Sequence, residues 1–90
     1  MLDVRYSTKL KKDLKLCAKR NYKLILLQQI IDILRIPDAL PEKNVDHSLT
    51  GDYKGYRECH VTPNWLLIYR IEEEELLLYR TGSHADLFGM

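Results

Sequence analysis

Residues 56–81, YRECHVTPNWLLIYRIEEEELLLYRT, decide the fold of this chain. Their β-branched, aromatic and aliphatic residues form three runs of strand length, separated by the short polar turns 62–64 and 72–75. The middle run, 65–71, is nearly all apolar, as expected of a central strand covered on both faces. The stretch therefore predicts an antiparallel three-strand meander, with strands at 56–61, 65–71 and 76–81.

The N-terminal part of the chain begins with a strand pattern and continues as a helix. Residues 2–6 alternate apolar and polar side chains, which predicts a short strand with one buried face. Ser7 or Thr8 can cap a helix, and apolar residues recur at helical spacing from Leu10 to Ala18. We expect this first helix to end near Asn21.

A second helix is expected from about Tyr22 to Ile36, where Pro37 ends it. Its apolar surface is broad, so the helix should be packed on more than one side. Residues 37–54 contain few strand formers and predict a loop. The complete pattern predicts an α+β fold: an N-terminal strand, two helices, then the meander, with both helices packed on one face of the sheet.

Length and composition indicate one small globular domain, residues 1–90, of which 46% are apolar and 30% charged. The chain has no apolar stretch of the roughly 20 residues that a membrane span requires. Its N-terminus lacks the apolar block of a signal peptide, so we expect a cytoplasmic protein that does not bind membranes. Cys17 and Cys59 match no metal-binding spacing, and we interpret them as small core residues.

The net charge of +1 hides an uneven distribution. Residues 1–36 contain nine Lys and Arg against three Asp, whereas residues 37–90 contain five Lys and Arg against ten Asp and Glu. Local fields steer association more than net charge does, so the basic half favours a polyanion or an acidic protein as partner. A solvated helix face explains the same charges equally well.

The three histidines, His47, His60 and His84, all lie in the second half of the chain. In the predicted meander His60 and Arg80 fall at the ends of the first and third strands, which meet at one end of the sheet, and Trp65 opens the middle strand there. Tyr56, Glu58 and His60 should share one strand face, and Leu76, Leu78 and Arg80 another. Periodicity alone thus predicts that His60, Trp65 and Arg80 gather in one place.

Such a group of residues suits the metal-free cleavage of RNA, because imidazoles exchange protons near neutrality, a guanidinium stabilises an anion, and aromatic rings stack on bases. Structural histidines are the plain alternative. Metal binding by the three histidines is disfavoured, since their separations of 13 and 24 residues match no short ligand motif. Two roles are open for Trp65 and Phe88, namely packing in the core and stacking on a base.

Four blocks of the second half resemble the YafQ branch of the RelE-type bacterial toxins. They are residues 46–51 (DHSLTG), 54–60 (KGYRECH), 63–69 (PNWLLIY) and 80–88 (RTGSHADLF). The resemblance implies a RelE-like fold and a toxin that cleaves messenger RNA in the ribosomal A site. It also implies inhibition by a cognate antitoxin, binding of operator DNA only through that antitoxin, and no cofactor.

The resemblance assigns the active site by position. The matching residues are His47, His60, Trp65, Arg80, His84 and Phe88. Asn64 and Arg57 are expected to bind substrate as well. Asn64 stands where the family commonly has Asp, and an amide cannot act as a carboxylate base, so proton abstraction must fall to a histidine.

We therefore expect a ribose 2′-hydroxyl to attack its adjacent phosphate, giving a 2′,3′-cyclic phosphate and a free 5′-hydroxyl. His84 is the expected general acid and His47 or His60 the base, while the other of these two positions the phosphate. Arg80 would stabilise the developing charge, Trp65 and Phe88 would stack on bases, and the lysine-rich first helix would bind ribosomal RNA. The alternatives are a non-catalytic toxin that binds gyrase, as ParE-type relatives do, or blocks the ribosome, and a metal-dependent nuclease.

Overall fold

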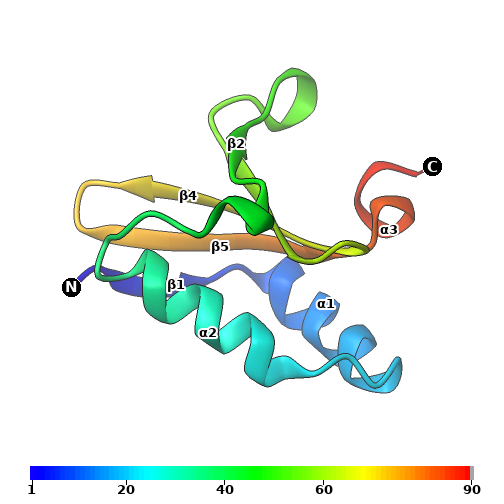
Figure 1. The fold of residues 1–90 in the computed structure, drawn as a ribbon. Helices are drawn as coiled ribbons and strands as arrows, with labels where there is room; N and C mark the ends of the chain where they lie inside the picture. The colour runs from blue at the N-terminus through cyan, green and yellow to red at the C-terminus, as the bar shows by residue number, and fades with distance from the viewer. Residues whose placement is uncertain (90) are drawn as a thin grey trace.

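The computed structural model describes residues 1–89, which form a five-stranded sheet with two long helices on one of its faces (Figure 1). The strands run in the order β1-β5-β4-β3-β2 across the sheet. The helices and strands are β1 (Asp3–Tyr6), α1 (Thr8–Lys19), α2 (Leu24–Leu34), β2 (His47–Ser48), β3 (Arg57–Thr62), β4 (Trp65–Glu72), β5 (Glu75–Gly82) and α3 (His84–Phe88). Two 3₁₀ turns, η1 (Glu42–Asn44) and η2 (Gly51–Tyr53), flank β2. The predicted α+β class, the meander and the helices on one face are confirmed.

The two long helices follow the capping signals of the sequence. The side chain of Ser7 accepts a hydrogen bond from the amide of Leu10, at 2.9 Å, and so caps α1. Beyond α1 the chain turns at Asn21, which has a positive φ of 61°. Helix α2 is shorter than the expected 22–36, because Lys23 at its N-cap is extended and Pro37 stops the helix from continuing.

Two strands pair in ways that the sequence did not predict. Strand β1 pairs with β5 in parallel, with Asp3 opposite Glu75 and Tyr6 opposite Leu78. Within the expected loop 37–54, the two-residue strand β2 pairs with β3, placing His47 opposite Glu58. Strand β2 therefore positions His47 on the sheet.

The sheet separates two apolar clusters. Trp65, Leu67 and Tyr69 of β4 face α1 and α2 in the main core, and the alternate residues Leu66 and Ile68 face the other side. A smaller cluster covers that second side, where Leu66 and Ile68 pack with Leu49, Tyr53, Tyr56, Tyr79, Leu87 and Phe88. Helix α3 and the loop around β2 lie over this second face in Figure 1.

A β-bulge in β5 changes the face on which Arg80 lies. Ile68 is opposite Arg80 but the next residue, Tyr69, is opposite Leu78, so Tyr79 is an extra residue in β5. Leu78 packs in the helix-facing core, whereas Arg80 aligns with Ile68 on the second face. The expectation that Leu76, Leu78 and Arg80 share one face is wrong, because strict alternation does not survive a bulge.

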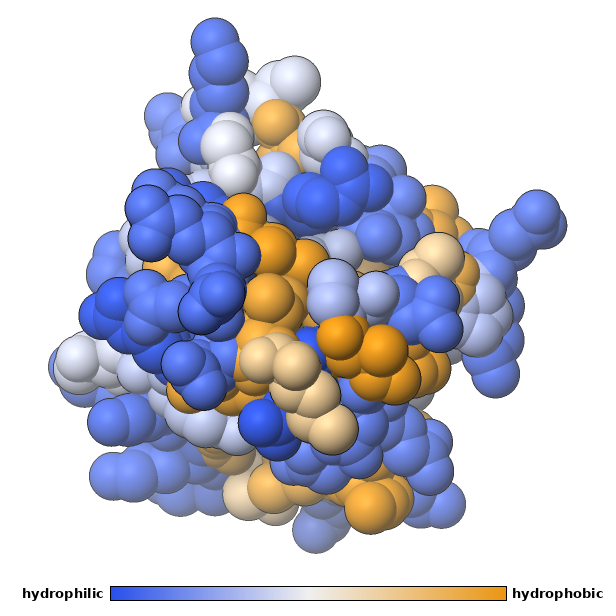
Figure 2. Space-filling model, turned by 90° about the vertical axis from the view of Figure 1, so that its left-hand side faces the viewer, coloured by the Kyte–Doolittle hydropathy of each residue, from blue (hydrophilic) through white to orange (hydrophobic). Residues whose placement is uncertain are grey.

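Figure 2 looks at the end of the molecule that carries the N-terminus and the β4–β5 turn, and shows a mostly hydrophilic surface with apolar side chains near its centre. The most exposed large apolar side chains of the described residues are Met1, Ile25, Ile36 and Val45. Among residues 1–89 none of the helices has both the length and the apolar character needed to cross a membrane.

Candidate active site

Two histidines flank a buried carboxylate on the second face of the sheet. Nε2 of His47 lies 3.2 Å from Oε1 of Glu58, and Nε2 of His60 lies 3.6 Å from the same oxygen. The Glu58 side chain is only 5% exposed, compared with 21% for His60 and 47% for His47. Glu58 and His60 are two residues apart on β3 and share a face, as predicted. Glu58 therefore hydrogen-bonds with His47 and lies close to His60, so that one carboxylate sits between the two imidazoles.

The third histidine reaches the same place from the end of β5. His84 begins α3, and the centre of its ring lies 6.0 Å from that of His60. Ser83 and Asp86 fix this helix start through a capping box, since each side chain accepts a hydrogen bond from the backbone amide of the other. His47, His60 and His84, which the resemblance assigns to one active site, thus lie together on the second face.

Phe88 lies one helical turn beyond His84, and the two ring centres are 5.9 Å apart. Its ring also meets that of Tyr53 edge-on, at 5.5 Å. Phe88 is half-buried and thus has ring surface beside the histidines. The base-stacking role expected of it fits this position.

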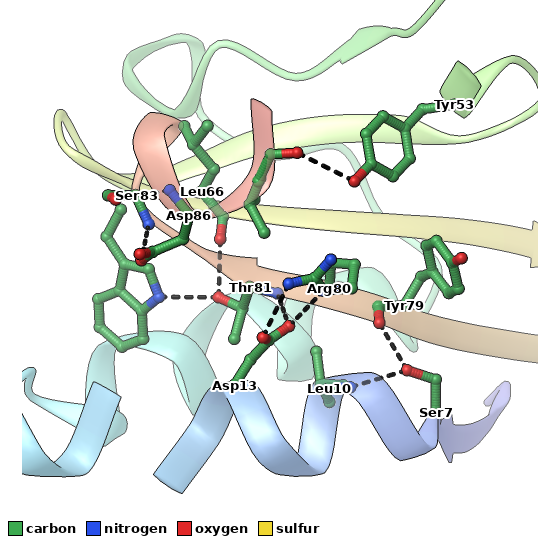
Figure 3. A network of polar contacts seen from close by, with 12 residues as sticks. Ser7, Leu10, Asp13, Tyr53, Leu66, Tyr79, Arg80, Thr81, Ser83 and Asp86 are labelled. Atoms are coloured by element: carbon green, nitrogen blue, oxygen red, sulfur yellow. Dashed lines mark hydrogen bonds and ion pairs between the residues drawn. The ribbon is translucent and has the colours of Figure 1, made fainter. Parts of the chain in front are cut away.

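Arg80 lies at the sheet edge, one strand away from the histidine cluster. Its position on β5 is opposite Ile68, which in turn is opposite Glu58 on β3, so about 10 Å separates the backbones of Arg80 and Glu58. The guanidinium donates hydrogen bonds to Asp13 of α1, from Nε at 2.7 Å and from Nη2 at 3.0 Å (Figure 3). These hydrogen bonds to Asp13 raise the pKa of Arg80 above its usual value, so the side chain stays charged.

The structure corrects the role expected of Trp65. The indole is 2% exposed and packs in the core against Tyr22, with ring centres 5.0 Å apart. Its Nε1 donates a hydrogen bond to the side chain of Thr81 at 2.7 Å. The bulge between His60 and Thr62 makes Trp65 pair with Thr62 and turns the indole to the helix side. Trp65 therefore leaves no ring face for a base and does not join His60 and Arg80.

Arg57 lies on the opposite strand face from Glu58 and His60. Its Nε donates to Asp46 at 3.2 Å, and its Nη1 donates to Ser48 at 2.9 Å. These hydrogen bonds fasten the residues on either side of His47 to β3. The guanidinium is thus directed to segment 46–48 while the side chain stays 43% exposed, and the substrate-binding role expected of Arg57 stays a prediction.

Asn64 is exposed in the β3–β4 turn. It lines a surface pocket of about 400 Å³ with Tyr22, Lys23, Leu26, Thr62 and Trp65. This pocket adjoins the helix-facing core and not the histidine cluster. The structure thus does not place Asn64 among the histidines.

Two features of the site were missed in the sequence. Glu58 was assigned to the face of His60, but nothing local marks it as a buried partner of two histidines. Three tyrosines also lie on the second face, where the ring of Tyr79 stacks on that of Tyr56 at 4.7 Å and meets that of Tyr53 edge-on at 6.2 Å. Only Tyr79 lies in a strand, so the strand pattern gave no signal that the three rings meet.

The cluster of His47, Glu58 and His60 can also hold a metal ion. One donor atom of each residue lies within 4.8 Å of the others, and imidazole with carboxylate is a donor set that zinc and copper accept. The two cysteines cannot contribute, because both are buried, and burial raises the pKa of Cys17 to about 11 and that of Cys59 further.

A twisted sheet packed by two helices on one face, with histidines gathered beside a short C-terminal helix on the other, defines a RelE-like toxin fold. A sequence model described as "Bacterial toxin of type II toxin-antitoxin system, YafQ" matches residues 2–89. The chain belongs to this family, the YafQ toxins of bacterial type II toxin–antitoxin systems.

Three relatives show how close the similarity is. The mRNA interferase toxin YafQ of Escherichia coli K12 is 44% identical over 89 residues, which cover 97% of this chain and 96% of that protein. YafQ in the E. coli DinJ–YafQ toxin–antitoxin complex superposes with a TM-score of 0.89 at 42% identity, covering 98% of each chain. A copper-bound mutant toxin from Helicobacter pylori superposes with a TM-score of 0.93 at 34% identity, covering 98% of this chain and 100% of that one.

Proposed function

We propose that this toxin is an endoribonuclease of the cytoplasm that cleaves messenger RNA in the ribosomal A site. The observation that carries the proposal is the meeting of His47, His60 and His84 on one face of the sheet, at the distances given above. Relatives named mRNA interferases support it.

The reaction we propose is attack by a ribose 2′-hydroxyl on the adjacent phosphate, which leaves a 2′,3′-cyclic phosphate and a free 5′-hydroxyl. His84 is exposed at the start of α3 and gives a proton to the departing 5′-oxygen. His47 or His60 takes the proton of the 2′-hydroxyl, and the other of the two binds the phosphate. Each such proton transfer contributes about 10²–10⁴-fold.

Arg80 supplies the positive charge beside the phosphorane. Asp13 binds Nε and Nη2, so Nη1 is the nitrogen that reaches toward a phosphate oxygen. Phe88 stacks on a base next to the cut. Asn64 contacts the RNA strand at the point where the strand passes the β3–β4 turn.

The partners follow from charge and from the relatives. The exposed lysines of α1 form a basic face suited to the phosphates of ribosomal RNA: Lys9, Lys11, Lys12, Lys15 and Lys19. Because the related YafQ has been solved with DinJ, we propose that a cognate antitoxin also holds this toxin inactive, and that operator DNA is bound only through that antitoxin.

A metal-dependent nuclease is the second candidate, favoured by the donor atoms of His47, Glu58 and His60 and by the copper-bound relative. We propose metal-independent cleavage nevertheless, because a metal on these nitrogens would block the base. Cleavage in a chelator separates the two candidates.

The experiment incubates the purified toxin with messenger RNA on programmed ribosomes and analyses the product ends. The buffer keeps the Mg²⁺ that ribosomes need and contains a chelator selective for transition metals such as zinc and copper. Cyclic phosphate ends are expected from the wild type, and His84→Gln should lower the rate by at least about 10²-fold, since an amide cannot transfer the proton. Ala85→Gln, an exposed change on the same helix, is the matched control and should cleave normally. Intact RNA with folded wild type would instead support a toxin that acts by binding, and activity restored only by added metal would support the second candidate.

A further inference from the structure

A cavity beside the proposed active site combines aromatic walls with a carboxylate. It lies between η2 and α3, measures about 280 Å³, and is lined by Thr50, Asp52, Tyr53, Leu87 and Phe88. None of these residues except Phe88 has a part in the chemistry proposed above. The cavity is therefore distinct from the groups assigned to the chemistry, although Phe88 joins the two.

The two sides of this cavity are held together. The hydroxyl of Tyr53, directed at α3 in Figure 3, donates a hydrogen bond to the carbonyl of Leu87 at 3.1 Å. The ring of Tyr53 meets that of Phe88 at an interplanar angle of 80°, which fixes the orientation of the phenyl ring. The aromatic walls are thus set before any ligand arrives.

The cavity adjoins the place where we propose that the RNA is cut. Phe88 lines it and also lies 5.9 Å from the ring of His84, centre to centre. A base that stacks on Phe88 inside the cavity would belong to a nucleotide next to the scissile phosphate. Stacking by itself is tolerant of sequence, because every base has an aromatic face.

Asp52 is the charged residue among those that line the cavity. An exposed carboxylate repels phosphate, so at the rim of a site for a polyanion it suits the N–H donors of a base better than the backbone. Guanine offers two adjacent N–H groups, N1–H and the N2 amino group, which match the two carboxylate oxygens. Adenine and cytosine offer only an amino group beside an acceptor, and uracil offers one N–H between two carbonyls.

We propose that this cavity is a subsite for a guanine base of the RNA, and that Asp52 determines its specificity. The proposal rests on the proposed function, because it takes RNA as the substrate. Thr50 borders the cavity and supplies a further polar group at the base edge. The preference that follows is for RNA with guanine beside the cut.

The test measures binding, so that it does not depend on cleavage. Labelled hexanucleotides differ in one base only and carry a 2′-deoxy sugar at the cut, and their affinities are measured by fluorescence anisotropy. We expect the wild type to bind the guanine oligonucleotide about 10–100-fold more tightly than the other three, as paired base contacts typically discriminate. Asp52→Asn should lose this preference and leave the affinity for the other three within about twofold.

Glu73→Gln is the matched control, because it removes an exposed carboxylate at the β4–β5 turn, the opposite end of the sheet from α3 (Figure 1). It should keep the guanine preference. Equal binding of all four oligonucleotides by the wild type, or a preference that survives Asp52→Asn, would overturn the subsite. If the oligonucleotides bind with the expected preference but messenger RNA on ribosomes is not cleaved, the proposed reaction is wrong and the subsite stands.

Discussion

The carboxylate of Asp13 on α1 accepts hydrogen bonds from both Nε and Nη2 of Arg80 on β5, and a third from the backbone amide of Thr81 at 3.1 Å. The side chains of Asp13 and Arg80 are 13% and 21% exposed, so water screens the pair only weakly. The paired contact fixes the plane of the guanidinium. Asp13 therefore ties α1 to the edge of the sheet and orients the cation of the candidate site at once.

Replacing Asp13 by Ala should destabilise the protein and slow RNA cleavage. The change removes hydrogen bonds to a charged group and leaves a half-buried guanidinium without its partner, at a cost of about 1.5–3 kcal/mol in the free energy of unfolding. Urea denaturation measures this loss. Single-turnover cleavage of the folded variant measures the effect of the misplaced guanidinium.

Asp32→Ala is the control for Asp13→Ala, because Asp32 is exposed on α2 and its carboxylate accepts a hydrogen bond from Gln28 on the same helix. The control should change the free energy of unfolding by no more than about 0.5 kcal/mol. Equal stabilities of the two variants would show that the Asp13–Arg80 pair does not hold α1 to the sheet.

Trp65→Phe should reduce stability without weakening the binding of RNA. The variant loses the hydrogen bond from Nε1 to Thr81, worth about 1 kcal/mol, while a phenyl ring still fills much of the core site. Phe88→Ala also removes packing from the second-face cluster, but unlike Trp65→Phe it should raise the KM for RNA by about tenfold through lost stacking. A Trp65→Phe variant of wild-type stability with a raised KM would return the indole to the substrate site.

The same two aromatic residues show what the sequence could predict. The three strands of the meander are local features, each marked by alternation or by turn residues, and the structure has them within a residue or so of their predicted bounds. The orientation of Trp65 depends instead on the bulge at the end of β3, and that of Arg80 on the bulge at Tyr79. Neither bulge is marked by the composition of the sequence. Alternation therefore assigns the face of a strand residue correctly only as far as the bulge.

Long-range pairing was the other limit of prediction. The parallel contact between β1 and β5 joins residues that are about 70 positions apart, and β2 is too short to show a periodicity. Strand ends and short turns placed only His60 correctly at the site, because the same argument also put Trp65 there; His47 and His84 were assigned to the site through the resemblance. The role of Glu58 as a shared partner of His47 and His60 was not predicted, because its burial results from the pairing of β2 with β3.

Glu58→Ala should lower the cleavage rate by up to about 10²-fold, because His47 and His60 lose the carboxylate that sets their positions, and misplacement by an ångström has effects of that size. Glu58→Gln keeps an acceptor oxygen, so its cleavage rate should fall less than that of Glu58→Ala. Single-turnover cleavage on ribosomes gives both rates, with Glu74→Gln in the exposed β4–β5 turn as the control. A Glu58→Ala variant with the wild-type rate would show that the histidines do not need this support.

The stability that Asp86 contributes should disappear in acid. Hydrogen bonds from Arg20, at 2.5 and 3.1 Å, and from the amide of Ser83 lower the pKa of Asp86 from 3.8 to about 2. Because the folded pKa lies below the unfolded one, the contribution is complete above about pH 4 and is lost as the pH falls toward 2. Thermal melts of the wild type and Asp86→Asn should therefore differ by a constant Tm gap from pH 5 to 7, with the wild type more stable, and the gap should shrink steadily below pH 4. Glu73→Gln is the control, because it removes an exposed carboxylate, and its Tm gap should be small at every pH. A Tm gap for Asp86→Asn that stayed constant down to pH 2 would mean that the carboxylate charge does not stabilise the start of α3.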